Sequence, residues 1–200
     1  VTRAPVWAQR DVSRQILMML AELGRDAEHE RALSEFLEPP ATPLVIFADG
    51  LDLPYTPSGF MGEVDKAVFR QSLRESPYEG DRCFEWRVEP GESWVAMGWM
   101  EPADNWGDLP GGYDLTGARR LSFAARGKAG GEIVNVGIGL IDTGDYPDTL
   151  RERMRIELST EWQRFEMPLE GLDLSTVRTA FVIESELTVE RQSIFFDDIR

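Results

Sequence analysis

Hydrophobic positions change their spacing near residue 40 of this 200-residue chain. Before that point they recur at steps of three and four, the period of an amphipathic helix. Gly24 can end a first helix, Asp26 can cap a second, and the proline-rich stretch 39–43 forbids further helix. We therefore predict a helical N-terminal segment over residues 1–40, either packed against the main domain or serving as a linker or partner-binding arm. Its apolar positions are Val12, Ile16, Leu17, Leu20, Leu23, Ala32, Leu33, Phe36 and Leu37.

From residue 44 onward, short runs alternate hydrophobic and polar residues, the period of a β-strand. In the run Arg82–Val88, for example, Phe84, Trp86 and Val88 share one side. About nine such runs, separated by turns rich in Gly, Pro and Asp, indicate an all-β sandwich. The runs cover residues 44–48, 82–88, 93–100, 121–126, 134–140, 153–158, 165–167, 181–183 and 193–200. The turn at residues 90–92 predicts a hairpin between the second and third of them.

Composition indicates a packed and strongly acidic protein. The 42% hydrophobic content fits a globular core, and 36 acidic against 21 basic side chains give a net charge of −15. This charge repels nucleic acid and anionic membranes, and no apolar run of about 18 residues predicts membrane insertion. The single cysteine, Cys83, forms no internal disulfide and is expected to be a half-buried apolar residue rather than a nucleophile.

Motifs of common enzymes are absent from the sequence. It contains no G-x-S-x-G, HExxH or CxxC motif and no phosphate-binding glycine loop with lysine. Paired acids such as Glu184 and Glu186 imitate a glycosidase pair, but with a 15-residue excess of acids such pairs arise by chance. We predict that the protein is not an enzyme.

Five short segments together resemble a known family. They are Phe47–Leu51, Tyr78–Cys83, Tyr113–Gly117 before Leu121, Glu161–Phe165 before Pro168, and Phe196–Ile199. In this order they resemble the galactose-binding-like jelly rolls, which include many carbohydrate-binding modules of bacterial glycan-degrading enzymes. The resemblance covers residues 44–200. It implies an antiparallel two-sheet jelly-roll β-sandwich over residues 41–200, preceded by the short helical segment.

The same resemblance implies a structural calcium ion that joins the first and last strands. Asp49 and Asp197 would supply side-chain oxygens, and Asp81 or Gly80 a backbone carbonyl. Calcium prefers six to eight oxygen ligands of these kinds. In the alternative, Asp49 closes an Asx-type turn with Gly50, and Asp197 is a paired carboxylate at a sheet edge.

Glycan recognition needs aromatic platforms for the C–H faces of sugars and planar polar groups for their hydroxyls. We assign Trp86 and Trp94 to the core, and we predict that three other aromatic residues bind ligand: Trp99, Trp106 and Tyr113. Arg87, Asn135 and Arg155 are the predicted polar ligand-binding residues, drawn from strand faces that also carry Glu85, Arg153 and Glu157 beside the flat Gly137 and Gly139. Their arginines would suit an acidic sugar. A solvated outer face is the alternative interpretation.

Two functions follow from these patterns. The first is a non-catalytic carbohydrate-binding module for a polysaccharide or oligosaccharide, located outside the cytoplasm (periplasmic, cell-surface or secreted) and joined to other domains of a longer parent chain. The second is a ligand-sensing or protein-interaction ectodomain of a larger receptor or surface protein. Aromatic residues in loops favour the first, and the helical arm favours the second.

Overall fold

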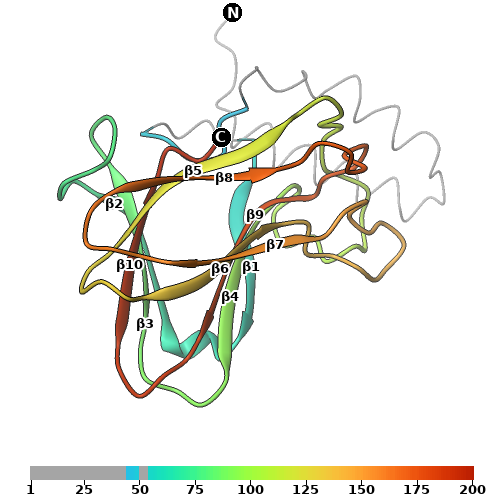
Figure 1. The fold of residues 1–200 in the computed structure, drawn as a ribbon. Helices are drawn as coiled ribbons and strands as arrows, with labels where there is room; N and C mark the ends of the chain where they lie inside the picture. Colours follow the sequence, from blue (N-terminus) through green and yellow to red (C-terminus); the bar gives the residue numbers. More distant parts are fainter. Residues whose placement is uncertain (1–43, 50–53) are drawn as a thin grey trace, which may run out of the picture.

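The protein, seen in a computed structural model, is described here over residues 44–49 and 54–200. The predicted helical segment 1–40 and its boundary with the domain lie outside the described residues. Ten strands and one short 3-10 helix, η1 (Val64–Lys66), make up the described regular structure (Figure 1). Every pair of neighbouring strands is antiparallel.

The strands form two five-stranded sheets. In the order of their neighbours, sheet 1 contains β1 (Thr56–Gly62), β4 (Trp94–Met100), β9 (Thr179–Glu186), β6 (Ile133–Ile138) and β7 (Glu152–Glu157). Sheet 2 contains β2 (Ala67–Leu73), β3 (Cys83–Val88), β10 (Gln192–Asp197), β5 (Arg120–Gly127) and β8 (Gln163–Pro168). This arrangement confirms the predicted antiparallel, two-sheet β-sandwich.

One hydrophobic core lies between the two sheets, built from the alternate side chains that each strand turns inward. Its centre is aromatic: Trp99 of β4 has its ring centroid 5.3 Å from that of Phe84 in β3 and 5.2 Å from that of Phe181 in β9. Phe196 of β10 stacks on Phe84 at 5.3 Å. These contacts join strands of both sheets. Trp99, which the sequence analysis predicts in the ligand-binding site, therefore lies at the centre of the core.

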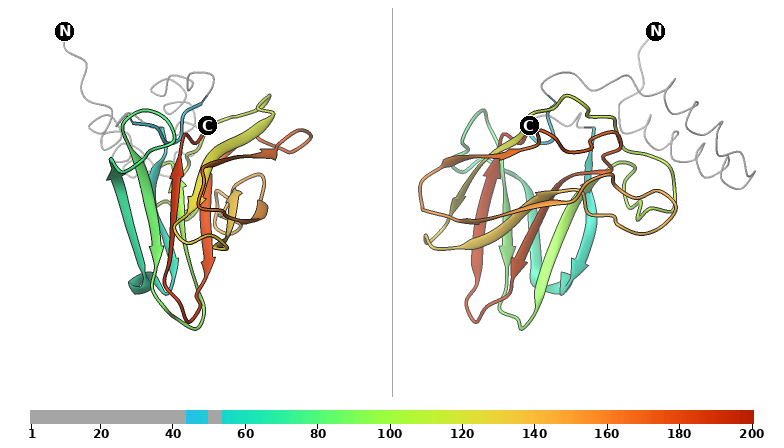
Figure 2. Two further views of the ribbon diagram at one scale, coloured as in Figure 1. Left: turned by 60° about the vertical axis from the view of Figure 1, so that its left-hand side comes forward. Right: turned by 45° about the vertical axis from the view of Figure 1, so that its right-hand side comes forward.

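The first described segment meets the C-terminal end of the chain (Figures 1 and 2). Phe47 and Ile199 form an isolated antiparallel bridge, and the backbone N–H of Ile46 donates to the carbonyl of Ile199 at 2.8 Å. The predicted strand at residues 44–48 is therefore reduced to a bridge, although Ile46 and Phe47 are buried as expected. The two ends of the domain are tied to each other without a full strand pair.

Three features of the sequence prediction need correction. The sequence pattern does not predict β1 or β2 as a strand. In β1, Pro57, Gly59 and Gly62 are typical of a turn. Both strands lie at sheet edges and contain register shifts, and edges tolerate such residues. The turn at residues 90–92 is not a hairpin, since β3 and β4 belong to different sheets and the turn crosses between them.

Within the described residues, no helix is long and apolar enough to cross a membrane.

Candidate ligand-binding face

A straight row of side chains crosses all five strands on the outer face of sheet 1. Strand register places Met61 opposite Ala96, Ala96 opposite Glu184, Glu184 opposite Asn135, and Asn135 opposite Arg155. Residues directly opposite in antiparallel strands point to the same side, and on β4, β9 and β6 the neighbours of the row are core residues: Val95, Met97, Ile183, Val134 and Val136. At about 4.8 Å per strand the row spans about 20 Å. Its Glu184, Asn135 and Arg155 end is polar and its Met61 and Ala96 end is apolar.

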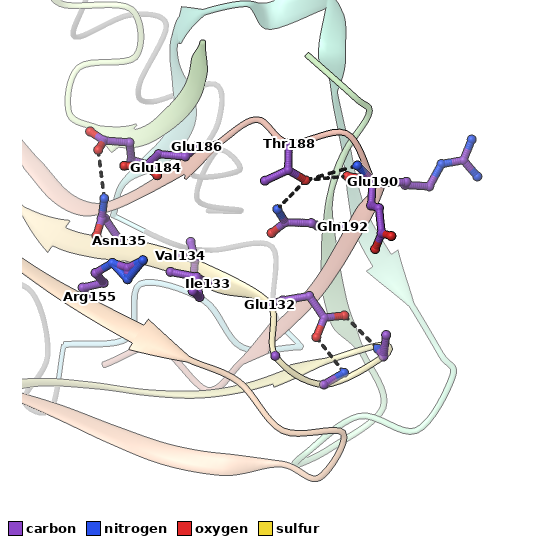
Figure 3. A pocket seen from close by; sticks show the side chains of 14 residues that line it. Glu132, Ile133, Val134, Asn135, Arg155, Glu184, Glu186, Thr188, Glu190 and Gln192 are labelled. Atoms are coloured by element: carbon purple, nitrogen blue, oxygen red, sulfur yellow. Dashed lines mark hydrogen bonds between the residues drawn. The ribbon is translucent and has the colours of Figure 1, made fainter. Parts of the chain in front are cut away.

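Hydrogen bonding fixes the middle of this row. The side-chain amide of Asn135 donates to a carboxylate oxygen of Glu184 at 3.1 Å (Figure 3). Arg155 lies beside them and forms no ion pair with any described residue. A planar amide, a carboxylate and a free guanidinium thus stand together on an accessible sheet face, where they can donate and accept hydrogen bonds.

The next row of the same face is flat but covered. It runs through Gly59, Gly98, Val182 and Gly137 to Arg153. The Met100 side chain lies over Gly59, and the Leu140 and Thr179 side chains lie over Gly98. The Arg153 guanidinium folds over Gly137 and donates to the carbonyls of Ile138, Gly139 and Glu152. Arg153 therefore serves the sheet, and burial lowers its pKa. In the first row Ala96 is only 1% exposed, so the accessible part is its polar end at Glu184, Asn135 and Arg155, which we call the open row.

On the other side of the open row stands an exposed tryptophan. Trp94, the first residue of β4, lies directly opposite Glu186 of β9. Its side chain is 40% exposed and shares the outer face with Ala96 and Gly98, which are too small to cover it. Trp94 thus presents an exposed aromatic side chain on the outer face of sheet 1, two residues before Ala96 along β4.

A hollow of about 310 Å³ opens next to the polar end of the row (Figure 3). Its wall combines the turn at residues 129–132, the start of β6, the end of β9 and the loop at residues 188–192, and it includes Asn135, Arg155 and Glu184 of the row. Glu132 is buried at the turn, where its carboxylate accepts N–H bonds from Lys128, Ala129 and Gly130 at 2.7–2.8 Å. The carboxylate thus holds the turn that shapes the hollow.

The structure brings together only two of the predicted ligand-binding residues. Asn135 and Arg155 are neighbours in the open row. Arg87 lies on sheet 2, where its Nε is 3.4 Å from a carboxylate oxygen of Glu89. The prediction grouped strands that belong to different sheets, and Glu85 is separated from the row in the same way.

The aromatic predictions need a larger correction. Trp99 is fully buried among core rings and offers no surface to a ligand, so its assignment to the site is wrong. Trp94, assigned to the core, is exposed instead. Trp106 is 39% exposed in the loop that follows β4, at the opposite end of that strand from Trp94. Tyr113 is half-buried and packs edge-on against Tyr55 at 5.4 Å.

The carboxylates predicted to bind calcium do meet at one turn. Asp197 of β10 accepts N–H bonds from Tyr78 at 2.8 Å, Glu79 at 3.1 Å and Asp198 at 2.8 Å. Asp49 accepts N–H bonds from Asp81 and Arg82, both at 2.6 Å. The first described segment, this turn and the last strand are thereby joined by hydrogen bonds.

This donor set does not fit a calcium ion as it is arranged. N–H groups, which repel cations, point at all four carboxylate oxygens, and Asp81 presents its N–H rather than its carbonyl to Asp49. Among the described residues, no three acidic, histidine or cysteine side chains converge in a way that would hold a metal. Calcium therefore stays a prediction, and the observed link between the strands is a set of hydrogen bonds.

Cys83 lies outside any candidate site. It is fully buried in β3, more deeply than the half-buried position expected. Burial raises the pKa of its thiol to about 11, so the thiol stays protonated and unreactive.

Comparison with known proteins supports the fold. No family model matches the chain, and no curated protein matches it. A solved family 30 carbohydrate-binding module superposes with a TM-score of 0.56 at 18% identity, over 78% of this chain and 95% of the module. The chain has the jelly-roll fold of these modules.

Two further structures show the same fold in different settings. A family 11 carbohydrate-binding module from Clostridium thermocellum, in complex with a β-1,3-1,4-mixed-linked tetrasaccharide, matches with a TM-score of 0.52 at 15% identity, over 78% of this chain and 92% of the module. An exo-β-agarase matches with a TM-score of 0.54 at 10% identity, over 78% of this chain but only 24% of its own. In the agarase the matching part is therefore a minor portion of a larger protein.

Proposed function

We propose that this domain is a non-catalytic carbohydrate-binding module that holds a polysaccharide or oligosaccharide on the outer face of sheet 1. The observation that carries the proposal is the row from Met61 to Arg155 with the exposed Trp94 beside it. Sugar C–H faces pack on aromatic rings, and sugar hydroxyls bond to amide, carboxylate and guanidinium groups. The jelly-roll neighbours, one of them bound to a tetrasaccharide, support this assignment.

The acid pair on this face suits binding rather than hydrolysis. Glu184 and Glu186 both lie on β9, two residues apart and on the same side. They are spaced by about 6.6 Å along one strand, so both stand beneath a ligand that lies on the sheet. Glycosidase carboxyls instead flank the bond that breaks. A ligand on this face therefore meets both acids from one side.

A module of this kind acts where its polysaccharide is found. We propose an extracytoplasmic location and attachment to other domains of a longer chain, in keeping with the minor share that the matching part has in the agarase. The ectodomain alternative depends on residues 1–40, which lie outside the described structure, and no described feature favours it.

Affinity electrophoresis through gels that contain single polysaccharides tests the proposal. The panel should include mixed-linked β-glucan, cellulose derivatives, agarose, chitosan and polygalacturonate. We expect at least one to retard the protein and Trp94→Ala to abolish the retardation while leaving the fold intact. If no polysaccharide retards the wild type, or if Trp94→Ala binds as well as the wild type, the proposed face is wrong.

A further inference from the structure

We propose that the outer face of sheet 2 carries a second site, at Arg126 of β5, for the carboxylate of an acidic sugar. This face lies on the opposite side of the sandwich from the proposed glycan face of sheet 1. The site rests on the proposed function for its class of ligand, a glycan, but shares no residue with the sheet 1 face. Two glycans can then be held at once, one on each side of the domain.

The guanidinium of Arg126 lies against two aromatic rings. Its central carbon is 4.1 Å from the centroid of the Phe195 ring and 5.2 Å from that of the Trp162 ring. Phe195 points outward from β10, since its neighbours Ile194 and Phe196 are core residues, yet it is only 8% exposed. Cation–π attraction holds a guanidinium over a ring without using its N–H groups. The rings therefore fix Arg126 in place and leave its N–H groups available.

No acceptor is paired with Arg126 in the described part of the chain. Its Nε is buried without a hydrogen-bond partner, whereas its two terminal nitrogens are not among the buried atoms and so reach the surface. A guanidinium whose terminal N–H groups are accessible and unpaired can bind a carboxylate through two parallel hydrogen bonds. Arg126 thus has the donors of an anion site already in position.

The other charged side chains on the strands of sheet 2 are all satisfied. Asp197 accepts three backbone N–H bonds and is buried. The rest form ion pairs: Arg70 with Glu85, Arg87 with Glu89, Arg120 with Glu166, and Arg164 with Asp198. Arg126 is therefore the one strand charge of this sheet that lacks a partner, and no acid of the strands competes with a ligand for it.

An aromatic pair stands next to this guanidinium. The indole N–H of Trp162 donates to the carbonyl of Ser76 at 2.9 Å, and the backbone N–H of Tyr78 donates to Asp197 at 2.8 Å. The loop between β2 and β3 is thereby tied to sheet 2. Tyr78 packs edge-on against Trp162, with centroids 6.0 Å apart, and is 40% exposed. A sugar whose carboxylate reaches Arg126 can pack its C–H face on the exposed part of this pair.

A uronic acid brings both features that the site offers. Its planar carboxylate matches the guanidinium fork, and its ring suits the aromatic pair of Tyr78 and Trp162. A neutral sugar leaves Arg126 unpaired, and a free inorganic anion makes no use of the rings. The net charge of −15 repels a uniformly charged polyanion. We therefore expect a glycan that carries acidic sugars at intervals along a neutral chain.

Calorimetric titration with two matched ligands tests this site. One ligand is a xylo-oligosaccharide with a single glucuronic acid branch, and the other is the same oligosaccharide with that carboxylate methyl-esterified. Both are titrated into Trp94→Ala, so that the sheet 1 face does not contribute. We expect the acid form to bind about tenfold more tightly than the ester. Arg126→Gln in this background should remove the preference, and Arg126→Lys, which keeps the charge but not the fork, should retain part of it.

The control is Arg120→Gln, which removes the same charge six residues earlier on β5, about 20 Å away. It should leave the preference for the acid form unchanged. An equal loss in Arg120→Gln and Arg126→Gln would overturn the site, because bulk charge would then explain the attraction. Equal affinity for acid and ester, or binding of neither, would also overturn it, and this comparison decides even if Arg126→Gln fails to fold.

The two faces can fail separately. If the wild type prefers the acid form and Trp94→Ala does not, the acidic sugar binds on sheet 1, which overturns the second site and leaves the proposed function intact. If neutral glycans bind nowhere while the acid form still depends on Arg126, the sheet 1 face is wrong and the second site stands.

Discussion

Trp94 on β4 and Glu186 on β9 stand directly opposite each other on the outer face of sheet 1. The Trp94 ring lies over Gly62, where a Cβ atom would come within 3.1 Å of the ring and 2.2 Å of the Trp94 carbonyl oxygen. Gly62, with a positive φ of 74°, thus leaves room for the indole. The Trp94 ring therefore lies on the β1 side of β4, and Glu186 lies on its β9 side.

The two tryptophans of β4 should respond oppositely to truncation. Trp99→Ala removes a fully buried ring that contacts Phe69, Phe84 and Phe181, and we expect a loss of about 3–5 kcal/mol in the free energy of unfolding. Trp94→Ala removes a ring that is 40% exposed, and we expect a loss of about 1 kcal/mol or less together with loss of glycan binding. Urea denaturation followed by fluorescence measures the stability of both variants, and affinity electrophoresis measures their glycan binding.

A conservative variant separates ring shape from mere bulk. Trp94→Phe keeps an aromatic face and should retain part of the affinity that Trp94→Ala loses. If Trp94→Ala were as unstable as Trp99→Ala, Trp94 would be a packing residue, and its role in the proposed site would be lost.

The sequence analysis assigned Trp94 to the core and Trp99 to the surface, and the structure reverses both. This outcome shows what hydrophobic alternation can predict about a strand. Period two placed Trp94 and Trp99 on opposite faces, which is correct, but the period does not say which face is inside. The neighbours on each face give no clear signal either. Trp94 shares its face with the small Ala96 and Gly98 but also with the large, fully buried Met100, and Trp99 shares its face with Val95 and Met97.

The row from Met61 to Arg155 could not be derived from one sequence. Glu184 lies opposite both Ala96 and Asn135 because β9 lies between β4 and β6. Sheet order depends on packing between segments that are far apart in the chain, and short-range patterns carry no record of it. Arg87 and Asn135 both occupy outward positions, yet the structure places them on opposite sides of the sandwich.

Glu132 should be a stabilising residue whose loss also alters the hollow. Its buried carboxylate accepts three backbone N–H bonds from the turn at residues 128–130. Glu132→Ala leaves those donors without a partner, and we expect a loss of about 1–3 kcal/mol in the free energy of unfolding. Glu132→Gln keeps one acceptor oxygen and should lose less. Equal stability of all three proteins in urea would show that the turn does not depend on this carboxylate.

Asp197 should stabilise the domain even when calcium is removed. In Asp197→Asn one acceptor oxygen becomes an NH2 group that faces a backbone N–H of Tyr78, Glu79 or Asp198. We expect a loss of about 1–3 kcal/mol in the free energy of unfolding in excess chelator. The calcium hypothesis predicts otherwise. In it the carboxylates of Asp49 and Asp197 repel each other when calcium is absent, so replacing Asp197 changes the free energy of unfolding of the calcium-free protein little.

Melting in chelator and in excess calcium provides the comparison. The hydrogen-bonded junction predicts the same melting temperature for the wild type in both, with Asp197→Asn lower by the same amount in each. A rise of the wild-type melting temperature in calcium that Asp197→Asn removes would restore the calcium prediction, with Asp49 and Asp197 as ligands.

The stability that Asp197 contributes should depend on pH in a direction opposite to that of an ordinary paired carboxylate. Burial raises the pKa of Asp197 above its usual 3.8, the N–H bonds from Glu79, Asp198 and Tyr78 oppose this rise, and the negative charge of Asp49 adds to it. The folded state therefore favours the protonated carboxyl. This contribution is fully present below 3.8, the unfolded value, and is lost as the pH rises through the folded pKa.

The stability advantage of the wild type over Asp197→Asn should accordingly grow as the pH falls through this window. The variant lacks the titrating group, so the difference between the two proteins removes the contribution of the other acids. Asp49→Asn takes away the charge that adds to the shift and should narrow the window. Urea denaturation of the three proteins at a series of acid pH values measures this. An advantage that shrinks on acidification would mean that the N–H bonds outweigh the burial of the carboxylate.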